Sequence, residues 1–432
     1  MSRREFLYLA SLSTIFWAGG CATDPVTGKS ELMLVSESME IDIDKKNSPH
    51  QFSTDYGISQ DKALNRYLED IGKRLAATSH RPGMPYSFHV VNAVYVNAYA
   101  FPGGSIAATR GILLNLENEA ELASLLGHEI GHVNARHTAE QMSKGMLTQA
   151  VLAGISIYAS YQMPGYDQLI SQLGMMGAGA LLASYSRDNE READALGMAY
   201  MVRTGYGTDG FIGLMDMLNT QSKHQMNAFE LLFATHPMSD ERYRRAIKTA
   251  RFRYGYAKDQ PVFRERYMDN TSKLRAQKDA IEAMQAGEQE MAKQNFSQAE
   301  RYFIKAVDRA SNDYAGLCLI AKCKLAREKM RDALAYAERA VRVYPTEAQA
   351  RHLAGYAKIK LRRYDEAYED FSTYEKLLPG NPNTVFFKGL SLEGMGRINA
   401  SANQYNRYLQ SVKEGKLAKH AYQRLVRWGY IR

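Results

Sequence analysis

Cysteine is scarce in this sequence: only three of the 432 residues are cysteines, at positions 21, 318 and 323. Cys318 and Cys323 are five residues apart within a helical pattern, so they point to different faces of a helix and should not pair. The sequence therefore implies no disulfide framework. Cys21 is better explained by its place near the N-terminus.

Long uninterrupted apolar runs are absent as well. The most apolar stretch, residues 147–185, is rich in Ala, Gly and Met, but Pro164 and several Gln and Asp residues interrupt it. No run within it approaches the ~18 residues that indicate a membrane-spanning helix. We expect helices packed around the functional site, and a membrane hairpin is the alternative.

The net charge of +8 is unevenly distributed, because residues 240–278 contain twelve Lys or Arg against five Asp or Glu, a local net charge of +7. The simplest interpretation is that these residues form the solvent-exposed face of a linker. The alternative is a surface that faces lipid phosphates. Nucleic acid is not expected as a partner, because the N-terminus indicates export.

The first twenty residues have the layout of a secretory signal. A basic head with Arg3 and Arg4 precedes a short apolar run at 6–18, and small residues lead up to Cys21. The run is too short for a permanent span of the bilayer. The paired arginines resemble a twin-arginine signal, and AGGC at 18–21 resembles a lipobox, although Ala18 stands where Leu is usual.

A lipobox makes Cys21 the acylated N-terminus, which would anchor the protein to a membrane. A plain cleaved signal, with Cys21 incidental, is the alternative. In Gram-negative lipoproteins an Asp after this cysteine favours the inner membrane, and here Ala22 follows instead. By that resemblance we expect a periplasmic protein that is lipid-anchored to the outer membrane.

The remaining chain is expected to contain two folded parts. We expect a signal at 1–20 and a polar tether and lead-in at 21–60. The first folded part, residues 61–250, shows helical spacing at 61–77, 119–142 and 189–203. It also shows strand patterns at 86–96 and 98–109. A turn at 102–104 breaks the second strand pattern. We therefore predict an α+β domain, mostly helical with a small β-sheet, then a basic linker at 251–275.

Residues 276–432 repeat with a period of 34. Small residues recur at this spacing in one series, and three further series keep the same step: Gly287, Ala321, Gly355, Gly389; Ala299, Ala333, Ala367, Ser401; Phe303, Ala337, Phe371, Tyr405; Ala306, Ala340, Tyr374, Tyr408. This period is typical of tetratricopeptide (TPR) repeats, pairs of helices that stack into a solenoid. Such an all-α solenoid has a concave face that binds peptides or proteins, although it can also serve only as a spacer.

The residues with the clearest chemistry are His128 and His132, separated by Glu129 and two others in the sequence HEIGH. On a helix, residues four apart share a face, so both imidazoles can reach one metal ion. Glu129 lies beside them and can take a proton from a metal-bound water. The spacing therefore predicts a zinc site, with one ion per chain, in a hydrolytic enzyme.

Catalytic zinc needs a third protein ligand and an open fourth position. A third histidine six residues beyond His132 is absent, since Thr138 occupies that position. We predict Glu190, which lies 58 residues after His132 at the start of a helix. Asp194, one turn further on, can accept a hydrogen bond from a ligating histidine.

At these residues the sequence resembles the gluzincin metallopeptidases of the CAAX-prenyl-protease and HtpX type, and best their soluble periplasmic BepA-like branch, which carries TPR repeats. The matching stretches are NAYAFPGG at 97–104, HEIGH at 128–132, SRDNEREAD at 186–194, and THP at 235–237 followed by Arg242. The resemblance implies that the strand before the Pro-Gly-Gly turn lies along the substrate. It also implies that His236 approaches the zinc and that Arg242 supports the site.

Two roles of His236 remain open. As a residue before proline it should lie outside a helix, so it could occupy the fourth zinc position and hold the enzyme inactive. It could instead stabilise the oxyanion of the transition state. The resemblance implies hydrolysis of misassembled outer-membrane proteins, with the repeats docked on an outer-membrane assembly machine. The alternative function is a chaperone or assembly factor with proteolysis in reserve.

Overall fold

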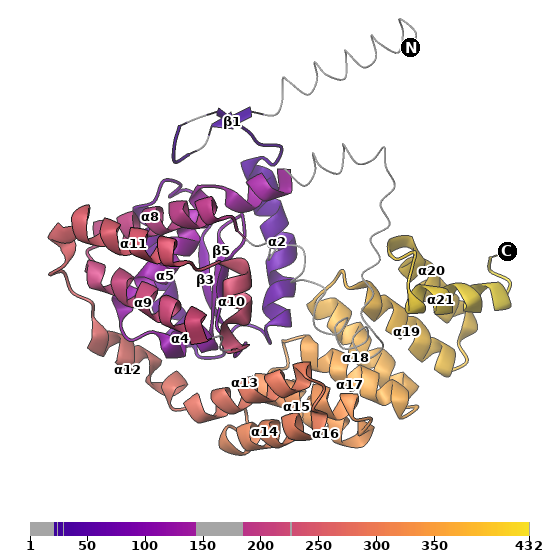
Figure 1. Cartoon of the computed structure of the whole chain (residues 1–432). Helices are drawn as coiled ribbons and strands as arrows, with labels where there is room; N and C mark the ends of the chain where they lie inside the picture. Colours follow the sequence, from indigo (N-terminus) through magenta and orange to yellow (C-terminus); the bar gives the residue numbers. More distant parts are fainter. Residues whose placement is uncertain (1–20, 24, 29, 144–184, 225–226, 432) are drawn as a thin grey trace, which may run out of the picture.

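The computed structural model describes residues 21–23, 25–28, 30–143, 185–224 and 227–431. Figure 1 shows a helical domain around a small sheet, followed by an arc of helix pairs that ends at the C-terminus. The elements before the arc are β1 (Cys21–Thr23), β2 (Ser30–Leu32), α2 (Glu37–Thr54), α3 (Lys62–Ala77), β3 (Ser87–Val91), β4 (Ala98–Ala100), β5 (Ser105–Thr109), α4 (Arg110–Asn115), α5 (Glu119–Asn134), α8 (Arg187–Arg203), α9 (Thr208–His224), η1 (Asn227–Phe229), α10 (Glu230–Thr235), α11 (Asp240–Phe252), η2 (Gly255–Ala257) and α12 (Arg264–Arg275). The predicted class, mostly helical α+β followed by an all-α solenoid, is confirmed.

The sheet has three strands in the order β3-β5-β4, with β5 in the centre. β3 and β5 are parallel, and β4 and β5 are antiparallel, with Ala98 opposite Ala108. The turn at Pro102-Gly103-Gly104 separates β4 from β5, as the sequence predicted, and Gly104 has a φ of 102°, which favours glycine there. β4 is thus an edge strand, and no described strand pairs with its outer side.

Helix α5 carries the HEIGH sequence and helix α8 carries Glu190 and Asp194, and the two helices cross at very short range. A Cβ atom placed on Gly127 or Gly131 of α5 would lie 2.9 Å from a backbone oxygen of α8, and one on Gly197 would lie 2.6 Å from the His128 nitrogen. Only residues without a side chain permit this approach. The glycines therefore bring the backbone around His128 against the middle of α8, at Ala193 and Gly197.

Helix α2 corrects the expectation of a tether at 21–60. Residues 37–54 are helical and pack on the domain, with Glu40 completely buried between Arg81 and Arg136. Glu40 Oε2 lies 2.7 Å from Arg81 Nη2, and its Oε1 lies 3.0 Å from Arg136 Nε. The sequence pattern missed this helix because its buried side chains are mostly polar and it contains Pro49.

The helix predicted over 119–142 is interrupted after Asn134. Arg136 adopts a left-handed φ of 56°, and its guanidinium bonds Glu40 and the Val35 carbonyl oxygen. Helix resumes at 137–143 in a new direction. The break comes from a contact that is distant in sequence, so local periodicity could not predict it.

The basic stretch after residue 250 is also more ordered than a linker. Residues 264–275 form α12, which buries Tyr267 and Leu274 against the first domain. Arg266 forms a bidentate pair with Glu119, with Nη2 2.5 Å from Oε1. Residues 264–275 of the predicted linker are therefore helical and packed on the first domain, while the basic side chains of α11 other than Arg242 remain exposed.

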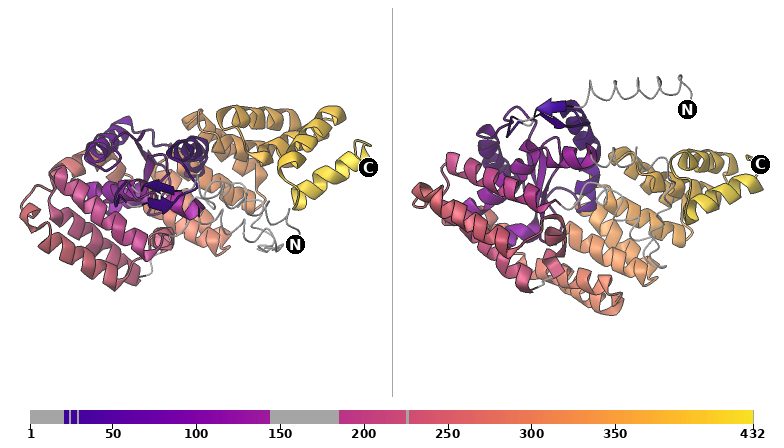
Figure 2. Two further views of the ribbon diagram at one scale, coloured as in Figure 1. Left: turned by 90° about the horizontal axis from the view of Figure 1, so that it is seen from above. Right: turned by 45° about the horizontal axis from the view of Figure 1, so that its top comes forward.

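The repeat part consists of α13 (Lys278–Ala292), α14 (Phe296–Arg309), α15 (Tyr314–Ala326), α16 (Met330–Val343), α17 (Gln349–Lys360), α18 (Tyr364–Leu377), α19 (Pro382–Gly394), α20 (Ile398–Ser411) and α21 (Lys416–Arg427). The predicted small positions lie where paired helices touch: a Cβ on Gly355 would lie 2.8 Å from Phe371. Figure 2 shows the pairs following one another into a curved arc, with α21 at its end. Cys318 and Cys323 are free and buried within α15, so they do not pair.

The arc packs directly on the first domain through buried polar contacts. Arg110, at the start of α4, pairs with Asp313 before α15, and their side chains are only 6% and 5% exposed. Lys322 of α15 lies 4.5 Å above the ring of Tyr56, and Ser53 donates a hydrogen bond to Glu347. The two parts therefore share an interface of buried charges.

The predicted signal at 1–20 and nearly all of the apolar stretch at 147–185 lie outside the described residues. Among the residues that the structure describes, no helix is both long and apolar enough to cross a membrane.

Candidate metal centre

The two histidines of the HEIGH sequence meet on the buried face of α5. Asn118 caps this helix by accepting a hydrogen bond from the Glu121 backbone at 2.9 Å. One turn apart, His128 and His132 bring their Nε2 atoms within 3.0 Å of each other, and both residues are buried. The predicted convergence of these imidazoles is therefore present in the fold.

Glu190 enters the same space from the first turn of α8. Ser186 and Asn189 begin this helix with a capping box, which fixes the direction of that turn. Glu190 Oε1 lies 3.3 Å from His132 Nε2, and Oε2 lies 3.6 Å from His128 Nε2. A carboxylate 58 residues beyond the second histidine is thus beside both imidazoles.

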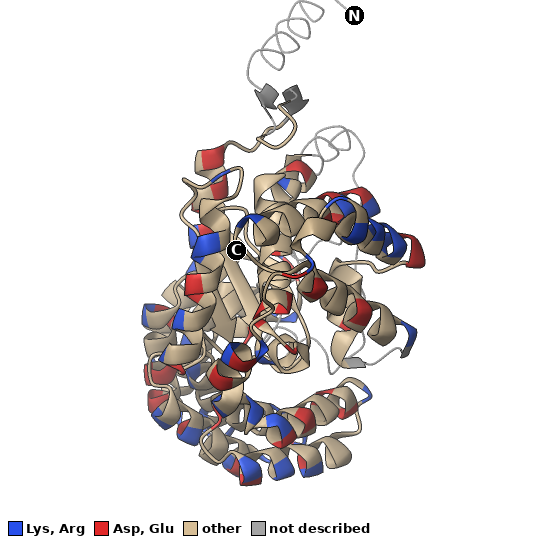
Figure 3. Ribbon diagram, turned by 90° about the vertical axis from the view of Figure 1, so that its left-hand side faces the viewer, with Lys and Arg blue, Asp and Glu red and all other residues tan. Residues whose placement is uncertain are grey.

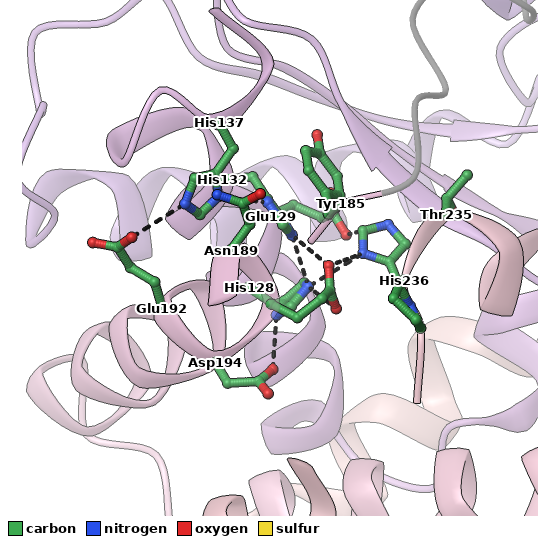
Figure 4. Close-up of polar contacts among 12 residues, drawn as sticks. His128, Glu129, His132, His137, Tyr185, Asn189, Glu192, Asp194, Thr235 and His236 are labelled. Carbon is green, nitrogen blue, oxygen red and sulfur yellow. Dashed lines mark hydrogen bonds and ion pairs between the residues drawn. The ribbon is translucent and has the colours of Figure 1, made fainter. Parts of the chain in front are cut away.

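His236 approaches from a third segment. It follows the last residue of α10, outside the helix, as expected of a residue that precedes proline. Its Nδ1 lies 3.0 Å from Glu190 Oε1 and 3.4 Å from His128 Nε2. Figure 4 shows His236 pointing toward the two histidines of α5.

One ligand atom from each of His128, His132, Glu190 and His236 lies within 4.8 Å of the others. Imidazole nitrogen and carboxylate oxygen are the donors of catalytic zinc sites, which use three protein ligands and leave one position open. In addition, Glu129 Oε2 is buried beside the group and has no hydrogen-bond partner among the described residues. The residues therefore fit a metal ion with an acidic group next to it.

Asp194 and Arg242 support the candidate metal ligands through contacts with His128 and Glu190. Asp194 Oδ1 lies 2.9 Å from His128 Nδ1, so the carboxylate can accept the proton that fixes this imidazole with Nε2 toward the site. Arg242 binds Asp194 with Nε and Nη2, both at 2.8 Å, and also contacts Glu190. Arg242 thereby joins Glu190 and Asp194 of α8.

Burial and the neighbouring charges together shift the pKa values of Glu190, His132 and Glu129. Although burial alone would raise it, the positive charges of His236 and Arg242 hold the pKa of Glu190 well below its usual range. Burial lowers the pKa of His132 far below its ordinary value, which keeps the imidazole neutral and able to bind a metal. Burial raises the pKa of Glu129, which strengthens this carboxylate as a proton acceptor.

Three residues around the site were not predicted. His137 Nδ1 lies 2.9 Å from His132 Nδ1, and His137 Nε2 lies 3.3 Å from Glu192 Oε2. The ring of Tyr185 stacks on His132 with a centroid distance of 3.7 Å. Because Arg136 breaks the helix after Asn134, His137 does not follow the spacing of a continuous helix and instead meets His132.

A metallopeptidase of the HExxH type is the class that this arrangement defines, because two histidines one helical turn apart and a distant carboxylate converge beside an acidic residue. The profile of Peptidase family M48 matches residues 62–250. Metalloprotease YcaL of Escherichia coli is 30% identical over 202 residues, which cover 46% of this chain and 72% of YcaL. The chain belongs to peptidase family M48, a family that implies a metal cofactor.

A second relative is the beta-barrel assembly-enhancing protease of Yersinia pestis, 33% identical over 209 residues. These residues cover 47% of this chain and 41% of that protein, so the match spans less than half of the relative. Among solved structures, the TPR protein YrrB aligns with 50% of this chain and 91% of its own, at 16% identity and a TM-score of 0.33. The repeat assignment rests on the helix pairs and their 34-residue period.

Proposed function

We propose that the protein is a zinc-dependent endopeptidase of the bacterial cell envelope. The observation that carries this proposal is the convergence of His128, His132 and Glu190 beside Glu129, whose buried Oε2 has no hydrogen-bond partner among the described residues. His128, His132 and Glu190 would hold one zinc ion. A bound zinc ion supplies Lewis acidity and an activated water at such a site.

The residues of the chain supply the proton transfers and the geometry. Glu129 takes the proton of the attacking water and returns it to the leaving amine, and its raised pKa strengthens it as the proton acceptor. Asp194 fixes the orientation of His128. The outer side of β4 can hold an extended peptide by main-chain hydrogen bonds, as edge strands do.

The first experiment tests the chemistry. Glu129→Gln should retain zinc, because the three proposed ligands remain, but should abolish casein hydrolysis, because an amide cannot accept the water proton. His128→Ala with His132→Ala should lose the zinc as well. Near-native turnover by Glu129→Gln with full zinc content would refute the mechanism.

The role of His236 remains a choice between two proposals. Its Nδ1 lies among the other ligand atoms, which favours a resting state in which His236 fills the fourth metal position and excludes water. In that case His236→Ala should raise basal casein hydrolysis. If His236 instead stabilises the oxyanion, the same substitution should lower activity by roughly two to three orders of magnitude. Unchanged activity, with zinc content verified, would exclude both roles.

The physiological substrates we propose are misassembled outer-membrane proteins, with the repeats docked on the outer-membrane assembly machinery. Support comes from the Yersinia pestis relative, which is a beta-barrel assembly-enhancing protease, and from the helical repeats of this chain. We further propose a periplasmic location with a lipid anchor at Cys21. The alternative is an assembly factor whose proteolysis is held in reserve, which predicts that Glu129→Gln cells keep normal outer-membrane assembly.

A further inference from the structure

The end of α11 and the turn after it expose aromatic side chains to solvent. Phe252 is 84% exposed and Tyr256 is 74% exposed, the two highest values for large hydrophobic side chains among the described residues. Tyr254 lies between them, with its ring 6.2 Å from that of Tyr256. A solvated linker face gives no reason for aromatic residues in this position.

Basic side chains surround these aromatic residues. Six exposed cations lie between positions 244 and 258, and none of them forms an ion pair within the part of the chain that the structure describes: Arg244, Arg245, Lys248, Arg251, Arg253 and Lys258. Arg253 lies 5.4 Å from the centre of the Tyr254 ring. Figure 3 views the molecule from the side on which Figure 1 labels α11, with lysine and arginine in blue.

Arg244, Lys248 and Phe252 succeed one another at four-residue intervals, so they lie on one face of α11. This face borders a shallow hollow of about 640 Å³. The acidic group in the hollow, Glu241, is paired with Arg191 at 3.0 Å. The exposed cations of this face are therefore not neutralised by their own surroundings.

We propose that this basic-aromatic face, formed by residues 244–258, docks on an anionic phospholipid surface. Lysine and arginine attract lipid phosphates, and phenylalanine and tyrosine are stabilised at the boundary between headgroups and acyl chains. The combination fits a bilayer better than an acidic protein, because charge pairing alone does not require exposed aromatic rings. The contact is independent of any acyl group at Cys21.

The opposite side of α11 reaches the metal centre. Arg242, Ala246 and Ala250 are buried on it, and Arg242 binds Asp194 and Glu190. One helix thus separates the docking face from the candidate active site. Docking through α11 would hold the peptidase domain in one orientation, with the site about one helix diameter, ~10 Å, from the docked surface.

The test is vesicle flotation of the full chain carrying Cys21→Ser, which removes the proposed acyl anchor. We expect binding to phosphatidylglycerol–phosphatidylcholine vesicles, a decrease with rising salt, and no binding to phosphatidylcholine alone. Arg245→Gln with Lys248→Gln should weaken binding roughly 25-fold, since each charge near an anionic surface contributes about fivefold. Phe252→Ser should weaken it further without changing the salt dependence.

The matched control is Lys413→Gln with Lys416→Gln, two exposed lysines near the end of the repeats. This variant should bind as the parent does, and circular dichroism should be the same for all variants. Equal binding to both vesicle types, or equal losses in the control and α11 variants, would overturn the proposal. Competition by free glycerol phosphate at the same headgroup concentration would also overturn it, since the face would then bind phosphate rather than a bilayer.

Discussion

Asp313 offers a direct measure of how strongly the repeats are coupled to the peptidase domain. Its carboxylate has two partners: it pairs with the buried guanidinium of Arg110, and it caps α15 by accepting a hydrogen bond from the Gly316 backbone at 2.9 Å. Arg110 is held in place by the Asn92 carbonyl oxygen, 3.0 Å from Nε. Loss of the carboxylate would therefore leave a fixed, buried cation without its anion.

The two contributions can be separated by the choice of substitution. Asp313→Ser keeps a capping oxygen and removes only the charge, whereas Asp313→Ala removes both. An unpaired buried charge costs about 3–5 kcal/mol, and we expect the lower end because a hollow beside Arg110 admits water. Asp313→Ala should cost about 1 kcal/mol more, for the lost cap.

Urea unfolding measures these differences, and Trp428 in the repeats provides a local fluorescence probe beside circular dichroism of the whole chain. Arg110→Met combined with Asp313→Ser should recover part of the loss, because no charge is then left unpaired. Asp279→Ser is the matched control, since Asp279 pairs with Arg309 on the surface and should contribute at most about 1 kcal/mol. If Asp313→Ser is within about 0.5 kcal/mol of the parent, the buried pair does not couple the two parts.

Two further predictions concern the interface and the metal. Burial raises the pKa of Glu288 to about 7. The contribution of Glu288 to stability is therefore full below the pKa of this group in the unfolded chain and is lost as pH rises toward 7. Glu288→Gln should then flatten the pH dependence of urea unfolding between pH 5 and 8. An unchanged profile would contradict this. Glu192→Gln should weaken zinc binding roughly 10- to 100-fold in chelator competition, because Glu192 orients His137 against His132. The same substitution should have no effect in a His137→Ala background; an equal effect there would exclude the relay.

The parts of the fold that the sequence predicts are those with a regular local pattern. The 34-residue spacing of small residues predicts the helix pairs, because contact between paired helices excludes larger side chains at those positions. Helix α3 has apolar residues on one face and an Asp61 cap, and it begins and ends close to its predicted limits. By contrast, α2 buries mainly polar residues, so its sequence resembles a tether until the partners of Glu40 are known.

The same distinction applies to the candidate site. The spacing of His128 and His132 is a property of one helix, and the structure brings them together with Glu190. His236 and Arg242 were placed here by resemblance, since neither lies near the histidines in sequence. No local pattern identifies Tyr185 as a site residue, since it is the last residue of the apolar stretch at 147–185 and reaches His132 only through the tertiary fold.

The contacts around His132 explain why the environment of a metal ligand is harder to predict than the ligand itself. Glu40 of α2 holds Arg136 in a left-handed conformation, and the resulting break turns the next helix so that His137 meets His132. An uninterrupted helix would have placed His137 on a different face from His132. Glu40, a buried carboxylate 92 residues before His132, therefore determines that His137 contacts Nδ1 of His132, a candidate zinc ligand.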